Sequence, residues 1–383
     1  MRIIYITTSI EENDYQDFTK SWFISLNPSN QNFHNKIIRS LANQNIVDVL
    51  SIRPFSKKHC KLKRLSSDEK IIGNIHYHYL KITRNKYLRS LSISKQANKL
   101  VSTFVENQEL IVTDTINPRC VQLANHLNKK FKLPVIGICT DSPSNISGTS
   151  KAYATYLLNN TKHFDGYITL TEALNNLYNQ NKKPSVTFEG IIESESQVTS
   201  IVKGKYLFFG GALLPRYGVY QLIEAFKQVD KKDISLLICG HHENKELLDA
   251  AIGEDNRIKF LGLLPVKEVL SLEANAIANI NPRPFTQDLD RLSIPSKTLE
   301  YLASGSVTIS VKNTELEKRF KDCAIWANSG SAEDLLLAIN KVLSMSEEER
   351  KNMAINAKNT ANSLYSIKKI GESLTDFLLN FIQ

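Results

Sequence analysis

The segment SIPSKTLEYLASGSVTISV, residues 293–311, decides the fold class of this chain. Pro295 suits the first turn of a helix, and Gly305 is typical of a residue that ends one. Residues 307–311 then form a short apolar run of strand length. The segment therefore predicts a helix followed directly by a buried strand, as in a parallel α/β layer.

The same alternation of short apolar runs and longer helix-period segments continues along the whole chain. A polar stretch at 193–204 divides it into two series and predicts a linker. We therefore expect an α/β fold with two Rossmann-like, doubly wound domains facing a cleft: residues 1–195, completed by a C-terminal helix at about 366–383, and residues 203–365. Ligands of such sheets bind beyond the carboxyl ends of the strands. The candidate strands are 3–7, 47–52, 111–113, 135–139, 166–170 and 186–188, then 206–209, 234–239, 258–261, 276–280 and 307–311.

The composition is that of an ordinary globular protein: 383 residues, 42% hydrophobic and 23% charged. Collagen-like and disordered classes are excluded. The first apolar run is too short for a signal peptide, and no stretch is long enough to predict a membrane span. Five scattered cysteines without a CxxC pair predict neither a disulfide framework nor a zinc knuckle. A reducing cytoplasm is the expected compartment.

The net charge of +9 is concentrated in residues 53–99, which hold thirteen Lys and Arg against only Asp68 and Glu69. One interpretation is a face that docks on an anionic membrane, where each basic residue contributes about 1 kcal/mol. The other is a solvated loop and a helix whose apolar stripe packs on its own sheet. A nucleic-acid surface is not expected, because the region has no recognition helix, finger or RNP motif. The apolar residues among the charges are Tyr87, Leu88, Leu91 and Ile93.

Two segments of the second half favour an anionic ligand. Residues 206–218 predict a strand, a glycine turn, a cationic residue and Gly218, after which a helix starts. Glycines allow a ligand to approach the backbone closely. A helix start offers free N–H groups to a phosphate. An ordinary βα turn has the same pattern. At the other helix start, amides at Ser296 and Lys297 face the strand ends. Glu300, just over one turn in, can accept hydrogen bonds from vicinal hydroxyls such as those of a ribose. A solvated helix residue is the alternative, although its apolar neighbours predict a partner for this carboxylate.

Four segments in this order resemble the nucleotide-sugar domain of GT-B glycosyltransferases, specifically the retaining family 4 group. The architecture covers essentially the whole chain, whereas the specific motifs are confined to about 206–310. The segments are FGGALLPRYGVYQLIEAF (209–226), ISLLICG (234–240), IKFLGLLPVKEVLSL (258–272) and IPSKTLEYLASG (294–305).

The resemblance implies a retaining, metal-independent transfer of a sugar from a nucleoside diphosphate sugar, with a UDP-sugar favoured and no other cofactor. It implies that Glu300 binds the donor ribose and that Gly211 and Arg216 meet the diphosphate. It also implies that the backbone at Leu263 reads the nucleobase and that Ser296 and Lys297 supply amides and charge to the distal phosphate. The implied acceptor is a hydroxyl of a glycan or polyprenyl-linked saccharide. A bacterial enzyme of capsule or exopolysaccharide synthesis, peripheral on the inner face of the membrane, would fit the basic region.

The chain departs from the family pattern at several positions. Arg216 is expected to replace two family cations, and Asp288 or Asp290 a family glutamate that contacts the donor sugar. Asp141, which follows a first-half strand, is the candidate contact near the reacting carbon, although an ordinary turn has the same residues. The departures are Ala212, Tyr217, Leu292 and Thr140.

Three rival functions remain open at this point: a silent subunit, a sugar-nucleotide epimerase and a protein-glycosylating transferase. The departures favour a catalytically silent subunit that supports a partner enzyme. A GT-B sugar-nucleotide epimerase uses the same fold and donor, but the sparse carboxylates in these loops disfavour it. A metal site at His241-His242-Glu243 is not expected, because adjacent histidines do not easily face one ion.

Overall fold

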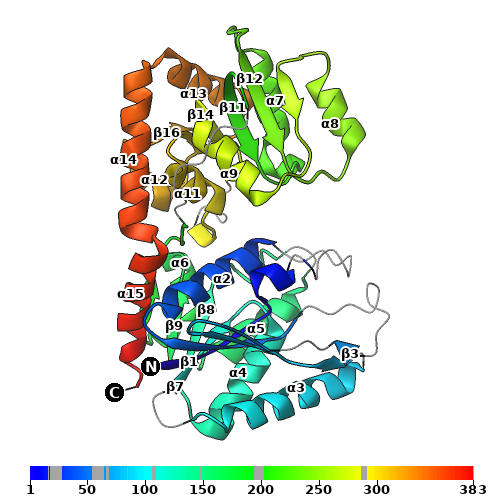
Figure 1. The fold of residues 1–383 in the computed structure, drawn as a ribbon, viewed down its shortest axis with the longest axis vertical. Coiled ribbons are helices and arrows are strands. Elements are labelled where there is room, and N and C mark those ends of the chain that lie inside the picture. The colour runs from blue at the N-terminus through cyan, green and yellow to red at the C-terminus, as the bar shows by residue number, and fades with distance from the viewer. Residues whose placement is uncertain are drawn as a thin grey trace. The chain divides into compact units, whose positions relative to one another are not determined.

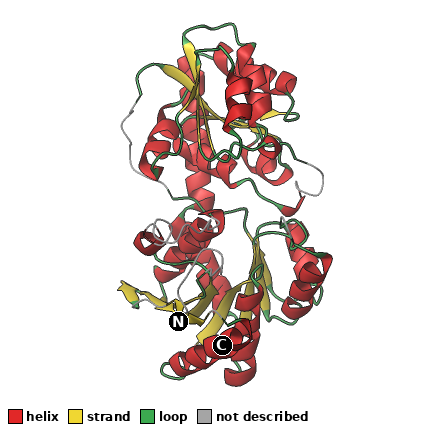
Figure 2. Cartoon of the chain, turned by 90° about the vertical axis from the view of Figure 1, so that its right-hand side faces the viewer, coloured by secondary structure: helices red, strands yellow, loops and turns green. Residues whose placement is uncertain are grey.

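The computed structural model describes residues 1–15, 17, 28–53, 64–65, 69–83, 85–105, 109–146, 149–193, 202–285 and 291–382. They form two compact units: unit 1 comprises Met1–Ile191 with Ile367–Gln383, and unit 2 comprises Ile192–Ser366 (Figure 1). In each unit helices lie against both faces of a mainly parallel sheet (Figure 2). The predicted α/β class is therefore confirmed. Most of the expected linker lies outside the described residues.

Unit 1 is built on a sheet of order β10-β9-β8-β7-β1-β2-β5-β4, in which only β4 runs antiparallel to its neighbour. Its strands are β1 (Arg2–Thr7), β2 (Ile46–Ser51), β4 (Lys70–Ile72), β5 (Ile75–Tyr79), β7 (Glu109–Asp114), β8 (Val135–Cys139), β9 (Gly166–Thr169) and β10 (Ser185–Thr187), with β3 (Arg64–Leu65) and β6 (Ile82–Thr83) as a separate pair. Its helices are α2 (Pro28–Ala42), α3 (Lys86–Val101), α4 (Pro118–Phe131), α5 (Lys151–Thr161), α6 (Glu172–Tyr178) and α15 (Ile367–Leu379).

The edge of this sheet differs from the sequence analysis, which placed a loop or a helix across 53–99. Strands β4 and β5 occupy part of that region. Strand β5 alternates buried apolar residues with half-buried histidines, the pattern of a strand whose second face is partly exposed. Continuous apolar runs identify central parallel strands, which are buried on both faces, but not a strand such as β5 that alternates apolar and polar residues.

The last helix, α15, belongs to unit 1 and packs along α2. The two backbones approach closely, because a Cβ at Gly371 would lie 2.2 Å from the carbonyl oxygen of Ser40. Asn45 donates a hydrogen bond of 2.9 Å to the hydroxyl of Thr375. Residues distant in the chain thus complete one helical layer, in which α2 contacts β2 and β5 and α15 contacts β10.

Unit 2 has a fully parallel sheet of order β13-β12-β11-β14-β15-β16. Its strands are β11 (Lys205–Gly210), β12 (Ile234–Cys239), β13 (Ile258–Phe260), β14 (Ala278–Asn281), β15 (Val307–Val311) and β16 (Ile325–Ala327). Its helices are α7 (Val219–Lys227), α8 (Lys245–Ile252), α9 (Val266–Asn275), α11 (Ser296–Ser304), α12 (Thr314–Phe320), α13 (Ala332–Ser344) and α14 (Glu347–Tyr365), with a 3-10 turn, η1 (Pro215–Tyr217).

Strand β11 shows why this sheet holds helices on both faces. Leu207 and Phe209 join the core formed with α7 and α13, whereas Tyr206 and Phe208 join the core on the α9 side. Complete burial of a large apolar side chain contributes about 1.5–3 kcal/mol, so both faces must be covered. An apolar run without polar alternation is the expected sequence of such a strand.

Candidate functional site

The strand order of unit 2 creates a switch point between β11 and β14. The chain proceeds outward from β11 through β12 to β13, and then returns to β14 on the other side of β11. The loops after β11 and β14 therefore leave the sheet in opposite directions. A crevice at such a point is where open α/β sheets bind ligands.

The loop after β11 is held in place by glycines. Gly211 is half-buried, donates a backbone hydrogen bond of 3.0 Å to the carbonyl of Cys239 and precedes η1 in the chain. Gly218 has a φ of 77°, and a Cβ there would lie 2.2 Å from the carbonyl oxygen of Pro282. Only glycine allows α7 to begin this close to the segment after β14. The two loops flanking the switch point are thus in direct contact.

Helix α11 follows β14, and its first turn lies at the same edge of the sheet. It starts after Pro295 and ends at Gly305, whose φ of 92° is left-handed, as the sequence predicts. Within the described part of the chain no side chain caps its first turn. Ser296, at this start, is exposed. An uncapped helix start is suited to an anion.

Hydrogen bonds fix α11 on three strands. The buried Tyr301 hydroxyl lies 3.0 Å from the backbone nitrogen of Gly210 at the end of β11. The Thr298 hydroxyl accepts a 2.8 Å hydrogen bond from Asn281 of β14 and lies 2.9 Å from the Ser310 hydroxyl of β15. The position of the helix start relative to the β11 loop is therefore set by buried contacts rather than by the surface.

A chain of three charged side chains runs along α11 and onto α9. Lys297 Nζ lies 2.9 Å from Glu300 and 3.2 Å from Glu273 of α9, whose carboxylate is buried. Burial lowers the pKa of Lys297, but the carboxylates of Glu300 and Glu273 raise it by more, so its pKa lies well above the usual range. Lys297 therefore stays charged. Glu300, whose side chain is one-third exposed, has the partner that its apolar neighbours predict.

Two arginines, one from the loop after β11 and one from the segment after β14, lie near one aromatic ring. The Arg216 guanidinium lies 5.1 Å from the centre of the Tyr217 ring, and that of Arg283 lies 5.5 Å from the same ring. Arg283 also lies 5.7 Å from the ring of Phe285. Such cation–π contacts hold a guanidinium in place while leaving its N–H groups available. Arg283 was not predicted from the sequence as a site residue. Its position two residues after β14 was a usable signal, because ligands of parallel sheets bind beyond the carboxyl ends of the strands.

Leu263 lies in the loop that follows β13 and is 75% exposed. The preceding Gly262 has a φ of 74°, and its carbonyl accepts a hydrogen bond of 2.9 Å from Gly240 after β12. The side chain of Leu263 has no packing role that explains its identity. A function through its backbone stays a prediction.

Asp141 belongs to unit 1, where it follows β8 and is half-buried. Its carboxylate accepts a 2.7 Å hydrogen bond from the backbone of Ser142, and its carbonyl accepts one of 3.1 Å from Tyr178. The turn predicted for this segment is present, and the role of the carboxylate stays a prediction. Asp288 and Asp290 lie outside the described residues.

Unit 1 also holds a buried histidine at its own switch point, between β1 and β7. His34 is fully buried, lies 2.7 Å from the Tyr5 hydroxyl and 3.6 Å from the carboxylate of Asp114. Burial lowers the pKa of His34, while Asp114 acts in the opposite direction. A neutral histidine in this network packs the core, and we assign it no contact with substrate.

Comparisons with known proteins bear on the fold and on unit 2. Residues 191–360 match the family model described as "Glycosyl transferases group 1". A search of curated proteins found no match. Among solved structures, sucrose-phosphate synthase from Thermosynechococcus elongatus is 12% identical with a TM-score of 0.69, covering 99% of this chain and 98% of the other. HepE from Anabaena, solved with UDP, is 14% identical with a TM-score of 0.68, covering 99% and 100%.

A third similar structure is described as trehalose-6-phosphate from E. coli bound with UDP-2-fluoro glucose. It is 11% identical with a TM-score of 0.67, and 99% of each chain is covered. At these identities the structural likenesses define the fold, which is GT-B over the whole chain. The family match adds a glycosyl transferases group 1 domain in unit 2. The protein is a glycosyltransferase.

Proposed function

We propose that this glycosyltransferase is of the retaining family 4 type and moves a sugar from a nucleoside diphosphate sugar to a hydroxyl of a glycan or polyprenyl-linked acceptor. A UDP-sugar is the favoured donor, since similar GT-B structures hold UDP or a UDP-sugar analogue. The observation that carries the proposal is the start of α11, where uncapped amides, Lys297 and Glu300 lie beside the β11 loop.

In this proposal the diphosphate rests against the start of α11, and Glu300 accepts hydrogen bonds from the ribose hydroxyls. Lys297, Arg216 and Arg283 supply fixed positive charge near the departing diphosphate. Because these groups are held before reaction begins, they lower the barrier without reorganising. The transfer is proposed to need no metal and no nucleophilic side chain. Asp141 is proposed as a contact near the reacting carbon.

The proposal predicts slow release of UDP from UDP-glucose or a related donor by the isolated protein, with water as acceptor. The released sugar should first appear as the α-anomer if the donor is α-linked, because retention preserves that configuration. Nucleotide release measured by chromatography and the anomer identified by NMR test both parts. The release rate should not rise on addition of Mg²⁺ or Mn²⁺. Absence of release with every nucleotide sugar tested would contradict the proposal and favour a silent subunit.

We further propose that α3 docks this protein on an anionic membrane surface. At 100° per residue, five exposed residues fall on one arc of about 120°, while buried residues at 93, 97 and 101 fall on the opposite side. The helix therefore carries an apolar and basic outer face in addition to the stripe that packs on the protein. The outer-face residues are Tyr87, Leu88, Leu91, Lys95 and Lys99.

The basic region at 53–99 also holds lysines outside this face of α3. Lys57, Lys58, Lys61 and Lys63 lie outside the described residues, and Lys70 is paired with carboxylates of unit 1. No helix in the described residues has the length and apolarity that crossing a bilayer demands. We propose attachment through the outer face of α3.

Replacing Leu91 with serine should weaken binding to vesicles of anionic lipid by about five- to tenfold, because a half-inserted leucine contributes about 1 kcal/mol or more. The matched control is Leu337→Ser on α13 of unit 2, a leucine that is 62% exposed, against 70% for Leu91. Sedimentation with vesicles measures both. Equal losses for the two variants, or equal binding of the wild type to neutral vesicles, would refute the α3 assignment.

A further inference from the structure

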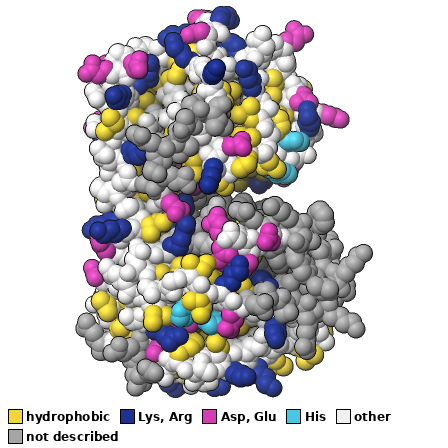
Figure 3. Space-filling view, viewed as in Figure 1, with side chains coloured by type: hydrophobic (Ala, Val, Ile, Leu, Met, Phe, Trp, Pro, Cys, Tyr) yellow, Lys and Arg dark blue, Asp and Glu magenta, His cyan; other side chains and the backbone are white. Residues whose placement is uncertain are grey.

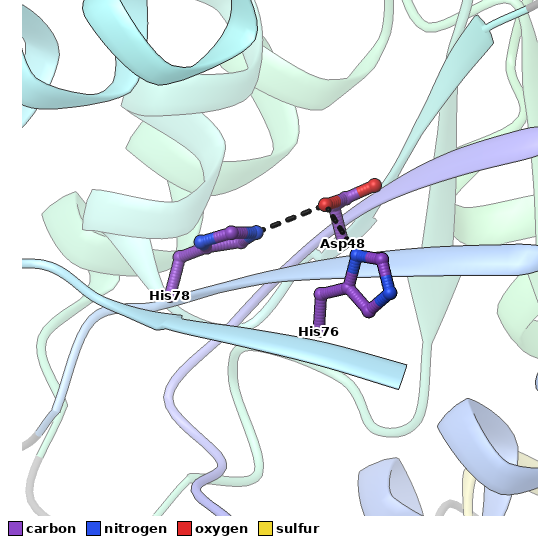
Figure 4. Close-up of side chains that lie close together, drawn as sticks. All are labelled: Asp48, His76 and His78. Carbon is purple, nitrogen blue, oxygen red and sulfur yellow. Dashed lines mark hydrogen bonds and ion pairs between the residues drawn. The ribbon is translucent and has the colours of Figure 1, made fainter. Parts of the chain in front are cut away.

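An acid and two histidines meet on one face of the unit 1 sheet, far in the sequence from the group 1 domain. Asp48 comes from β2, and His76 and His78 both come from β5 (Figure 4). Within the described part of the chain, these residues form the one group whose three ligand atoms could hold a metal ion. Those atoms all lie within 4.8 Å of one another.

The sheet register explains why the three side chains meet. Asp48 pairs directly with His76 across the parallel strands β2 and β5, and Leu50 pairs with His78. Residues two apart on a strand point to the same face, so both imidazoles share the face of Asp48. The sequence His-x-His on an alternating strand was therefore a usable signal that the sequence analysis did not take up.

The ligand atoms converge on one carboxylate oxygen. His78 Nε2 lies 2.9 Å and His76 Nδ1 lies 3.4 Å from Asp48 Oδ1. Ligand bonds of about 2.0–2.1 Å place neighbouring ligand atoms of a tetrahedral ion about 3.3–3.4 Å apart. The separation of 3.4 Å at His76 equals this value, and the separation of 2.9 Å at His78 is about 0.4 Å shorter. Small side-chain movements would admit an ion of that size.

Outer contacts orient the ligands as metal sites require. The other ring nitrogen of His78, Nδ1, lies 3.0 Å from Glu69, an arrangement that fixes the ring and directs Nε2 inward. Arg2 of β1 donates to Oδ2 of Asp48 at 2.6 Å and to Oδ1 at 3.3 Å, so the shorter of the two bonds is on the oxygen that faces away from the histidines. Asp48 is fully buried, whereas the side chains of His76 and His78 are 25% and 12% exposed. Histidine atoms reach the surface of unit 1, so an ion can enter from solvent (Figure 3).

We propose that Asp48, His76 and His78 form a binding site for a divalent first-row transition metal such as Zn²⁺, which links β5, the strand next to the edge of the sheet, to β2. Neutral imidazole nitrogens and one carboxylate are the donor set that such ions accept, with solvent completing the coordination. The ion would stabilise unit 1. It takes no part in the proposed donor site, whose residues belong to unit 2.

The surroundings of His78 hold several charged groups. Burial lowers the pKa of His78, but its hydrogen bonds to Asp48 and Glu69 raise it by more, so the net pKa is above the usual value. The charged and titratable groups around it are Asp48, Glu69, His76 and, through Asp48, Arg2.

Isothermal titration of the full chain with Zn²⁺ tests the site. We expect one Zn²⁺ bound with an affinity that falls about 30-fold or more in His76→Ala and in His78→Ala, with the melting temperature of the wild type raised by Zn²⁺. The matched control is His163→Ala, an exposed histidine of the same unit, which should bind as the wild type does. Visible spectra of the Co²⁺ form should change in the two site variants and not in the control.

A fold defect in the alanine variants is separable from loss of the ion. His76→Gln keeps much of the side-chain volume, and circular dichroism without metal reports its fold. A folded His76→Gln protein with weakened Zn²⁺ affinity supports the proposal. Zn²⁺ binding of equal affinity in the wild type and in the folded His76→Gln and His78→Ala variants would overturn it, as would absence of binding by the wild type at millimolar Zn²⁺. Donor binding by unit 2 should be the same in all of these variants, so failure here leaves the proposed function untouched.

Discussion

Replacing Glu300 with alanine is expected to weaken UDP binding about 100-fold while leaving the fold intact. In the proposed complex its carboxylate accepts hydrogen bonds from two ribose hydroxyls, and each charged hydrogen bond contributes about 1.5–3 kcal/mol. The side chain is one-third exposed, so part of this is lost to solvent and a net of about 2.7 kcal/mol, or 100-fold, remains. Lys297 keeps its second partner, the buried Glu273, which limits structural damage.

A titration with UDP measures the effect, and α12 offers a matched control. Glu315 forms an ion pair with Lys318 at the same three-residue spacing as that between Glu300 and Lys297, and its side chain is 32% exposed against 33%. Glu315→Ala should bind UDP as the wild type does. Similar affinities for the two variants would show that the ribose is not held by Glu300.

Replacing Gly240 with alanine is expected to destabilise unit 2 by about 4 kcal/mol or more. Gly240 has a φ of 137°, which L side chains rarely adopt, and a Cβ there would lie 1.7 Å from the carbonyl oxygen of Gly211. The clash is with backbone, so the loops after β11 and β12 must separate. Costs of this size come from a few mechanisms, of which steric conflict at a special φ is one.

Thermal unfolding distinguishes the clash from backbone strain alone. Gly262→Ala is the matched control, because Gly262 has a φ of 74° in the adjacent loop but nothing within 4 Å of an added Cβ. Strain alone costs about 1–2 kcal/mol, so its melting temperature should fall by a few degrees, against about 10 °C or more for Gly240→Ala. Equal shifts in the two variants would contradict the close approach of Gly240 and Gly211.

The sequence predicts helix α11 well because its determinants are local. Pro295 and Gly305 mark the two ends, and Lys297 and Glu300 are three residues apart, so their pairing follows from helix geometry. The central strands are predicted for a similar reason, since burial on both faces leaves a continuous apolar run. These features require no knowledge of what packs against them.

Features that depend on distant segments were not predictable in this way. Glu273 reaches Lys297 only because α9 packs beside α11, and Arg283 meets Tyr217 only because the loops after β14 and β11 meet at the switch point. The cluster at Asp48 depends on the register between β2 and β5, which a sequence of alternating residues does not fix. The sequence shows that these residues are present but not which distant residues they contact in the folded protein.

A crystal structure of the protein with UDP tests the proposed donor site most directly. We expect the two phosphates to lie at the amide groups of Ser296 and Lys297, with both ribose hydroxyls within about 3 Å of the Glu300 carboxylate. A nucleotide bound at another edge of unit 2, or one whose ribose has no contact with Glu300, would contradict the proposed donor site.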